Sequence, residues 1–450
     1  MKVTFLGGGL RPDGKGTIGG NMVEVSSNKS RVIFDFGIPI GQVNRYFDVF
    51  ERNKIYGFSA EKLASMNLFP AQYMKSLGKT EGANILLSHV HLDHYGTLRF
   101  VPALRETLGG SDSVRVYGTG EQHSLLYALL EIGRKPGVIG AYSPHSLDEL
   151  SEWKVSKFQV DHSIDASHGF LLEGRDGCVA YTGDFRFGKD CSVDDMAKHI
   201  AGADILVTEA TRTVNQGLVT EQDVRLAFEQ ICKAYRGLVA VIVGWYTYSK
   251  RIQTIIDASG GRMVVLDPAA AHMLDSIDGL NAPNVASKVK ILDSGLRKTG
   301  WELRLYEDSP SRFISIEQVN SDRDNSIVVI PTSEKSLLMR KTRNADKKES
   351  ILTTDGDVAI ASMSEPYDEE SGELASRIER YVSEILSIPL YYIHASGHAP
   401  LHQIAELVEV ARPRKVAVIH SEHPRILRNS LKTFNPDNVI IPRNGEGVIV

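Results

Sequence analysis

A dense group of metal-binding side chains directly after an apolar segment constrains this chain more than any other feature. The segment ANILLS (83–88) is typical of a buried strand, and it runs straight into HVHLDH (89–94). Four potential ligands therefore fall within six residues: His89, His91, Asp93 and His94. In an extended segment, residues two apart point the same way, so His89 and His91 can hold one ion. Histidine and carboxylate ligands suit zinc, and manganese is also possible.

Asp93 and His94 are expected to begin a helix that continues through YGTLRFVPAL (95–104). At the start of that helix their side chains can turn toward a second ion. A single histidine is more often a surface or packing residue than a ligand, but the clustered HxHxDH pattern favours the metal site.

Strands and helices alternate along much of the chain, which favours an α/β architecture. Short apolar runs predict early strands at 2–7, 21–27 and 31–37. From about residue 215 a second series of units begins, with a further strand predicted at FISIE (313–317), and it indicates an inserted lobe built on a parallel sheet. Residues 38–80 lack clean periodicity, and we interpret them as a long, partly helical insertion.

Composition excludes several classes of protein. A chain of 450 residues is expected to form two or three lobes, and its net charge of −5 provides no global basic footprint, so nucleic-acid binding requires a local patch. Three cysteines without CxxC spacing argue against a disulfide framework and a thiolate zinc site, and they favour a reducing compartment. Because no segment approaches the roughly 18 apolar residues of a membrane span, we expect a cytoplasmic protein without a membrane partner.

Further aspartates and histidines follow strands in the order of a known set of motifs. They are Asp35 in IFDFG, His162 in VDHSIDASHG, Asp184 in YTGDF and His420 in VAVIHSEHP. Alone, an aspartate after a strand is usually a turn former. Together with HVHLDH, the series resembles the motifs of metallo-β-lactamase-fold hydrolases. The resemblance implies two metal ions held by His89, His91, Asp93, His94, His162, Asp184 and His420, with Asp184 bridging the ions and Asp35 orienting the ligand histidines from a second shell.

The segments TEATR and HASGHA narrow the resemblance to the β-CASP nucleases, especially ribonuclease J and its relatives. Glu209 matches the first motif of that group, His398 the second and His420 the third. The implied fold is an αββα metallo-β-lactamase sandwich with an inserted β-CASP parallel-sheet lobe. The expected domains are a metallo-β-lactamase part at 1–208, a β-CASP domain at 209–388 and a metallo-β-lactamase return segment at 389–450.

The segment before the predicted helix LHQIAELVEVA (401–411) is suited to bind an anion. Free backbone N–H groups and the helix dipole favour an anion there, and a glycine lets the backbone come close to it. Without the resemblance, an ordinary helix-capping turn explains the segment equally well. With it, we expect phosphate or RNA to contact His394, Ser396, Gly397 and His398.

These features predict a two-metal phosphodiesterase that cleaves RNA. Two zinc ions, or manganese, share a hydroxide that attacks phosphorus. The residues expected to take part in catalysis are Asp93, Asp184, Glu209 and His398. Single-stranded RNA is the expected substrate, and an oligomer, most simply a dimer, is possible.

Two departures from the family pattern stand out. Ribonuclease J proteins usually carry a separate C-terminal domain of about a hundred residues, whereas this chain ends at Val450, about thirty residues after His420. The third motif usually contains HSIPDS, and here the segment is HSIDAS (162–167). The first departure leaves oligomeric state and exonuclease processivity open, and the second concerns the shape of a loop.

Other functions remain open on sequence alone. The same chemistry can act on DNA, although DNA-processing members of the eukaryotic branch often replace the third-motif histidine that His420 matches. A metallohydrolase of small esters or lactones has no need of the inserted lobe with TEATR and HASGHA. A non-catalytic RNA-binding relative is expected to have lost ligands, and all of them are present here.

Overall fold

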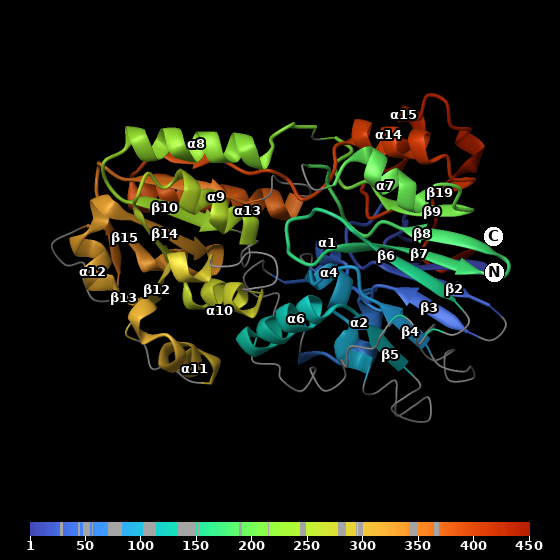
Figure 1. Ribbon diagram of the computed structural model, residues 1–450, viewed down its shortest axis with the longest axis horizontal. Helices are drawn as coiled ribbons and strands as arrows, with labels where there is room; N and C mark the ends of the chain where they lie inside the picture. The colour runs from blue at the N-terminus through green and yellow to red at the C-terminus, as the bar shows by residue number, and fades with distance from the viewer. Residues whose placement is uncertain are drawn as a thin grey trace. The chain divides into compact units, whose positions relative to one another are not determined.

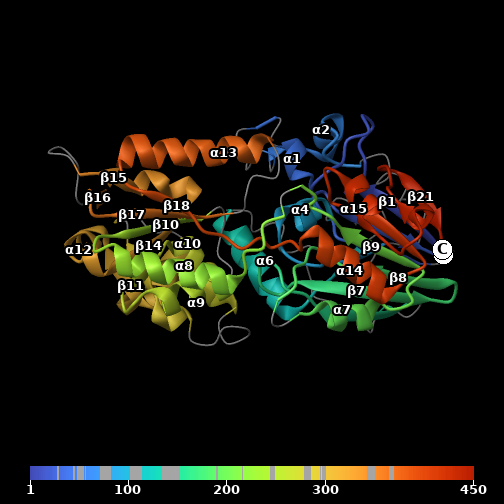
Figure 2. The same cartoon turned by 90° about the horizontal axis from the view of Figure 1, so that it is seen from above.

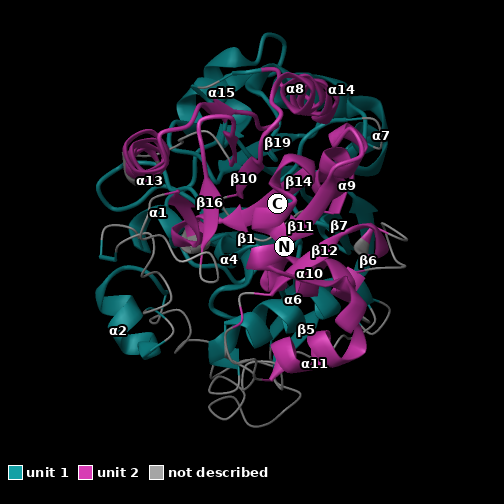
Figure 3. Cartoon of the chain, turned by 90° about the vertical axis from the view of Figure 1, so that its left-hand side faces the viewer, with its two compact units in different colours: residues 1–217, 397–450 teal, residues 218–396 magenta. Residues whose placement is uncertain are grey.

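The computed structural model of the chain divides into two compact units. Unit 1 comprises Met1–Gly217 and Gly397–Val450, and unit 2 comprises Leu218–Ser396 (Figure 3). The structure describes residues 1–27, 30–43, 46–47, 55, 57–70, 83–101, 114–133, 147, 150, 153–188, 191–214, 216–243, 249–277, 285–293, 295, 300–341, 350–363 and 369–450. None of the described helices is long and apolar enough to cross a membrane.

The first sheet of unit 1 joins strands from both ends of the chain in the order β21-β1-β2-β3-β4-β5. Its strands are β1 (Lys2–Gly7), β2 (Met22–Ser26), β3 (Arg31–Phe34), β4 (Ala83–Leu86), β5 (Val114–Tyr117) and β21 (Glu446–Ile449). The strands β3, β4 and β5 are parallel, whereas β1 pairs antiparallel with β2 and β21. Because β3 and β4 end at the same edge, Asp35 and the HVHLDH segment follow neighbouring strand ends.

The second sheet of unit 1 has the order β20-β19-β9-β8-β7-β6. Its strands are β6 (Lys154–Gln159), β7 (His168–Gly174), β8 (Gly177–Tyr181), β9 (Ile205–Glu209), β19 (Lys415–Ile419) and β20 (Val439–Ile440). The run from β8 to β20 is parallel. The segments that leave β8, β9 and β19 therefore share one edge, and they carry Asp184, Glu209 and His420.

An apolar core joins the two sheets of unit 1. It includes Phe34 and Leu86 from the first sheet and Phe170, Tyr181 and Val207 from the second. The rings of Phe34 and Tyr181 stack with centroids 4.9 Å apart. Through this core the two sheets of unit 1 pack against each other.

Helices cover the other face of the second sheet. They are α7 (Val193–Ile200), α14 (Leu401–Ala411) and α15 (Pro424–Ser430), which lie together beside β9 and β19 in Figure 1. In α14 the buried residues Ile404, Leu407, Val408 and Ala411 recur at helical spacing, so one stripe of the helix faces the sheet. The remaining helices described in unit 1 are α1 (Ile40–Val43), α2 (Ala60–Ser65), α4 (Leu92–Tyr95) and α6 (Gly120–Ile132).

Unit 2 is built on a seven-stranded sheet of order β13-β12-β11-β14-β10-β17-β18, in which every pairing is parallel. Its strands are β10 (Val239–Val243), β11 (Met263–Leu266), β12 (Lys290–Asp293), β13 (Phe313–Ser315), β14 (Ser326–Pro331), β17 (Val358–Ser362) and β18 (Leu390–Tyr392). The short strands β15 (Leu338–Arg340) and β16 (Ile351–Thr353) form a separate parallel pair. The lobe predicted on a parallel sheet is therefore present as a unit of its own.

Helices lie on both sides of the unit 2 sheet, as parallel strands joined by helical crossovers require. Figure 2 shows α8 and α9 on one side and α13 on the other. The helices are α8 (Glu221–Ala234), α9 (Ser249–Ala258), α10 (Pro268–Ile277), α11 (Trp301–Asp308), α12 (Ile316–Ser321) and α13 (Glu369–Arg380), with a π-helical turn at Tyr381–Leu386. Both units confirm the predicted α/β class.

The structure corrects two local predictions. Over the described residues, the helix expected to continue from Asp93 is a single turn, α4, followed by a 3₁₀ turn at Leu98–Phe100; residues 102–104 of the prediction lie outside the described residues. It stops because the carbonyls of Asp93 and His94 accept hydrogen bonds from the backbone N–H groups of Asn21 and Phe36 instead of extending the helix. The strand predicted at 313–317 ends at Ser315, whose side chain caps α12 in a capping box with Gln318.

The insertion predicted at 38–80 is described only in part. Its described residues include the helices α1 and α2, in agreement with a partly helical segment. The residues 44–45, 48–54, 56 and 71–80 lie outside the described residues.

Candidate metal centre

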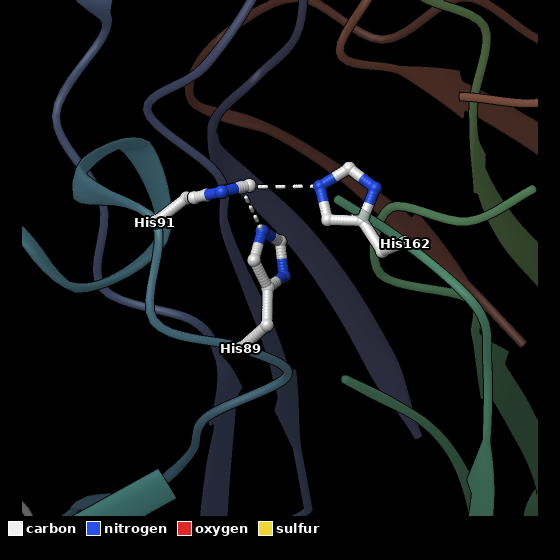
Figure 4. Close-up of side chains that lie close together, drawn as sticks. All are labelled: His89, His91 and His162. Atoms are coloured by element: carbon white, nitrogen blue, oxygen red, sulfur yellow. Dashed lines mark hydrogen bonds between the residues drawn. The ribbon is translucent and has the colours of Figure 1, made fainter. Parts of the chain in front are cut away.

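Three histidine rings converge in unit 1, at the ends of strands from its two sheets. We call His89, His91 and His162 the histidine trio; the first two follow β4 and the third follows β6. The Nδ1 atom of His91 lies 3.1 Å from Nε2 of His89 and 3.1 Å from Nε2 of His162, and Figure 4 shows the three rings facing one another. Tetrahedral zinc with Zn–N distances of about 2.0–2.1 Å places its ligand nitrogens about 3.3 Å apart. The spacing of the trio fits such an ion.

The outer edges of two trio rings are anchored by the protein. Nδ1 of His162 lies 2.6 Å from the carbonyl oxygen of Gly397, and Nδ1 of His89 lies 3.0 Å from Oγ of Ser88. A ring that donates its Nδ1 proton outward keeps a lone pair on Nε2, which is the form that a metal requires. These two contacts therefore direct the Nε2 atoms of His89 and His162 inward.

A second cluster lies beside the trio. We call Asp93, His94, Asp184 and His420 the mixed group, whose potential ligand atoms all lie within 4.8 Å of one another. Nε2 of His420 lies 3.0 Å from Oδ2 of Asp93 and 3.6 Å from Oδ2 of Asp184. Nε2 of His94 lies 3.1 Å from the same Asp184 oxygen. Two carboxylates and two imidazoles thus offer a second set of zinc or manganese ligands.

Asp184 faces both clusters. Its Oδ2 atom lies 3.9 Å from Nε2 of His89 and 3.9 Å from Nε2 of His162, in addition to its contacts with the mixed group. Its Oδ1 atom is buried and makes no hydrogen bond to any described residue. A buried carboxylate oxygen without a partner is costly unless it coordinates a cation, so the residues present fit a pair of metal ions.

Asp35 lies behind His94 rather than in either cluster. Its Oδ2 atom lies 2.6 Å from Nδ1 of His94 and accepts hydrogen bonds from the hydroxyls of Tyr181 and Ser88. Its Oδ1 atom accepts the backbone N–H of Ser88. Asp35 is fully buried and has a left-handed backbone, with φ of 59°. A non-glycine residue in this region is uncommon, and here it aims the carboxylate at the His94 ring.

Glu209 holds His398 at the end of β9. Nδ1 of His398 lies 2.9 and 2.8 Å from the two carboxylate oxygens of Glu209. The carboxylate also accepts the backbone N–H groups of Phe185 and Thr211, at 3.0 and 3.2 Å. His398 is the more accessible of the pair, with 21% of its side chain exposed against 1% for Glu209. Glu209 and His398 also form an overlapping potential ligand group with Asp184 and His420.

The segment predicted to contact phosphate divides between the two units. In unit 2, Nδ1 of His394 lies 3.3 Å from Nη1 of Arg251, and Ser396 is the last residue of that unit. In unit 1, Gly397 and His398 lie against His162 and Glu209.

Two backbone N–H groups at the start of α14 already have protein partners. Ala399 donates to the carbonyl of Phe185, and Leu401 donates to Oε1 of Gln216. An anion at this helix terminus is therefore expected to use other donors of the segment.

Electrostatics differ between the two clusters. Burial lowers the pKa of His91 to about 4, and burial together with neighbouring imidazoles lowers the pKa of His89 and His162 well below 6.5. All three trio rings are therefore neutral at neutral pH, as metal ligands must be.

In the mixed group, the carboxylates together raise the pKa of the two histidines more than burial lowers it. Burial lowers the pKa of His420, but Asp184 and Asp93 raise it to a net value of about 9. The same balance, with Asp35 added, raises the pKa of His94 well above 6.5. Burial raises the pKa of the Asp184 carboxyl, but His420 and His94 more than offset this and hold it well below 3.8. The mixed group thus concentrates negative charge that either ring protons or a cation can neutralise.

The sequence-based prediction missed several residues that contact the site. They include Ser88, Tyr181 and Thr211, whose hydroxyls contact Asp35, His89, Glu209 or His420. They also include Asn21, whose Nδ2 atom lies 3.0 Å from Nε2 of His94. Ser88 directly precedes His89, and Thr211 lies two residues after Glu209, so proximity to a predicted ligand was the only available signal. Which histidine each hydroxyl reaches depends on strand pairing.

Gly397 offers a direct test of the contact with His162. A Cβ atom at this position would lie 2.6 Å from Oγ of Ser163 and 2.9 Å from Cε1 of His162. We expect Gly397→Ala to displace the His162 ring and weaken metal binding by the trio about 10–100-fold, the range for a disturbed outer contact of a ligand. Zinc titration of the purified variant measures this, with Gly120→Ala as a control for glycine loss elsewhere, since a Cβ atom there meets nothing within 4 Å. Unchanged zinc affinity in Gly397→Ala would show that the close approach does not position His162.

Comparisons with known proteins agree with these features. No family profile matches the chain. Ribonuclease J of Thermus thermophilus is 25% identical over 385 residues, covering 80% of this chain and 62% of that protein. Ribonuclease J of Helicobacter pylori is 22% identical over 476 aligned residues, covering 100% of this chain and 61% of that protein. The chain thus spans about three fifths of the length of these curated relatives.

A solved structure shares the fold over the whole chain. It is a protein of unknown function from Enterococcus faecalis V583, with a TM-score of 0.73, 19% identity, and coverage of 100% of this chain and 99% of that one. At this identity the match shows a common fold. The sequence matches confirm the resemblance that the motifs predicted: this chain is similar to the ribonuclease J proteins.

Proposed function

We propose that this chain is a two-metal phosphodiesterase that cleaves single-stranded RNA. The observation that carries the proposal is the position of Asp184, which faces the histidine trio on one side and the mixed group on the other. The similarity of the chain to proteins named ribonuclease J supports RNA as the substrate.

The trio and the mixed group each hold one zinc or manganese ion in this proposal. Asp184 contributes to both sites, and Asp35 orients His94 from behind. When bound, the two ions supply positive charge near the scissile phosphate and a hydroxide nucleophile at neutral pH. Five of the seven proposed ligands are buried, which limits competition from bulk water: His89, His94, His162, Asp184 and His420.

His398 is proposed to protonate the leaving oxygen of the ribose. The carboxylate of Glu209 accepts a hydrogen bond from Nδ1–H of His398. This contact orients the ring, so that Nε2 is the nitrogen that can face a substrate. The partial exposure of His398, unlike the burial of the trio, suits a group that must reach a substrate atom. His394, Ser396 and Gly397 are proposed to contact phosphate in the same segment.

The proposal extends to the domains and the location of the protein. We assign the two sheets of unit 1 to a metallo-β-lactamase domain and the parallel sheet of unit 2 to a β-CASP domain. The unit boundaries, after Gly217 and after Ser396, lie nine and eight residues beyond the sequence-based domain boundaries after 208 and after 388. A chain with three cysteines and no CxxC spacing suits the reducing cytoplasm.

Cleavage assays test the proposal directly. Zinc- or manganese-loaded protein is incubated with a single-stranded RNA and the DNA of the same sequence, each with and without a 5′ phosphate. We expect cleavage of RNA alone, abolished by a chelator and restored by metal, and the product ladder distinguishes endonuclease from exonuclease action. Equal cleavage of DNA would remove the RNA assignment, and no cleavage with two ions bound would favour hydrolysis of a small ester.

A further inference from the structure

The hydroxyl of Thr211 lies between a carboxylate and a potential metal ligand. Its Oγ1 atom is 2.5 Å from Oε2 of Glu209 and 2.7 Å from Nδ1 of His420. All three residues lie in unit 1, and their side chains are almost completely buried. We call this chain of contacts the Glu209–Thr211–His420 relay.

The direction of the hydrogen bonds in the relay follows from their chemistry. Glu209 accepts two backbone N–H groups, which can only donate, so its carboxylate acts as an acceptor. The single hydroxyl proton of Thr211 therefore points to Glu209. The carbonyl of His420 is a competing acceptor at 3.2 Å, but a carboxylate at 2.5 Å is the stronger partner because the bond is charge-assisted.

When the Thr211 hydroxyl donates its hydrogen bond to Glu209, its oxygen can only accept a hydrogen bond from His420. The Nδ1 atom of His420 must then carry a proton, and in the neutral ring Nε2 must carry the lone pair. Nε2 is the atom that faces Asp93 and Asp184. The relay therefore selects the tautomer of His420 that can bind a metal ion in the mixed group.

The backbone holds the relay in place. Strand β9 pairs with β19 so that Glu209 lies opposite Ile419, directly before His420. His420 itself has a left-handed φ of 49°, which is uncommon for a non-glycine residue and turns its ring back toward the end of β9. Thr211 thus contacts the ring through a geometry that the sheet imposes.

The same arrangement recurs at the trio. Ser88 Oγ donates to Oδ2 of Asp35 at 2.7 Å and lies 3.0 Å from Nδ1 of His89. Ser88 Oγ also lies 3.2 Å from Nδ1 of His94, so a hydroxyl between a carboxylate and the outer nitrogen of a candidate ligand histidine occurs at both clusters. This repetition supports a positioning role over a chance contact.

We infer that Thr211 is a positioning residue that fixes the metal-binding tautomer of His420 through Glu209. The inference rests on the proposed two-ion function, because it concerns the ion of the mixed group. It implies that Glu209 orients two histidines at once: His398 directly and His420 through Thr211.

Zinc binding by three variants tests the inference without any activity assay. Thr211→Val keeps the shape but removes the hydroxyl, Thr211→Ser keeps the hydroxyl, and Thr213→Val removes a buried hydroxyl of the same segment outside the relay. The number of ions and their affinities are measured by zinc titration against a chromophoric chelator. Thermal unfolding of the metal-free proteins reports the cost to the fold.

We expect the unaltered protein to bind two zinc ions and Thr211→Val to bind one of them about 10–100-fold less tightly, since an outer contact of a ligand is lost. Thr211→Ser and Thr213→Val should keep both affinities within about threefold of the unaltered protein. Unchanged zinc affinities in Thr211→Val, with two ions on the unaltered protein, would overturn the inference alone. Fewer than two ions on the unaltered protein would overturn the two-ion proposal and this inference with it.

Discussion

Replacing Asp184 by asparagine is expected to lower RNA cleavage by at least about 1000-fold. The carboxylate faces both clusters, and asparagine keeps its size while removing the negative charge and one acceptor oxygen. Charge stabilisation by a bound ion is worth several kcal/mol, and about 4 kcal/mol corresponds to a thousandfold in rate. Initial rates on a 5′-labelled RNA, together with zinc content, measure the effect.

Asp195→Asn provides the matched control for Asp184→Asn. Asp195 lies on α7, where its exposed carboxylate contacts only a helix cap and a lysine in the same helix, Ser192 and Lys198. This change should leave cleavage and zinc content unaltered. If Asp184→Asn instead retains both full activity and two ions, the carboxylate does not join the two sites.

His398→Ala is expected to slow RNA cleavage by about 10²–10⁴-fold, the usual range for the loss of a general acid. Zinc content should stay at two ions, because the trio and the mixed group remain complete. The matched control is His402→Ala, which removes an exposed histidine from α14. Loss of an ion in His398→Ala would identify His398 as a ligand, as its overlapping group with Asp184, Glu209 and His420 permits.

The nature of the leaving group separates proton donation from substrate binding by His398. A nitrophenyl phosphodiester releases nitrophenolate, which departs without a proton, so its hydrolysis needs no general acid. We expect His398→Ala to hydrolyse this ester within about tenfold of the unaltered protein's rate while it cleaves RNA far more slowly. An equal loss on both substrates would mean that His398 acts in another way.

Sequence patterns were sufficient to predict which histidines and aspartates gather at the candidate site. The HVHLDH segment brings four potential ligands into six residues, and no folding detail is needed to see that such a cluster suits metal ions. The other aspartates and histidines each follow a strand, so their position at strand ends was also predictable, but the expectation of a single sheet edge was wrong because the strands belong to two sheets. The parallel lobe of unit 2 followed from alternating strands and helices in the same way.

Local helix length was not predictable from the same patterns. The segment after Asp93 looks helical by periodicity, yet it forms only one turn because Asn21 and Phe36 take the carbonyls that a longer helix would use. Those partners lie more than fifty residues earlier in the chain. A periodic pattern reports which face of a segment is apolar, but it carries no information about which distant backbone group competes for its hydrogen bonds.

The sequence by itself determined the ligand types, their order and the α/β class. Only the tertiary structure decided that Asp184 faces both clusters and that Thr211 reaches His420 across paired strands β9 and β19. It also decided that Ser88 and Tyr181 converge on Asp35. The reason is physical: a hydroxyl or carboxylate has a role only through the atoms within about 3 Å of it, and those neighbours are set by strand register and not by position along the chain.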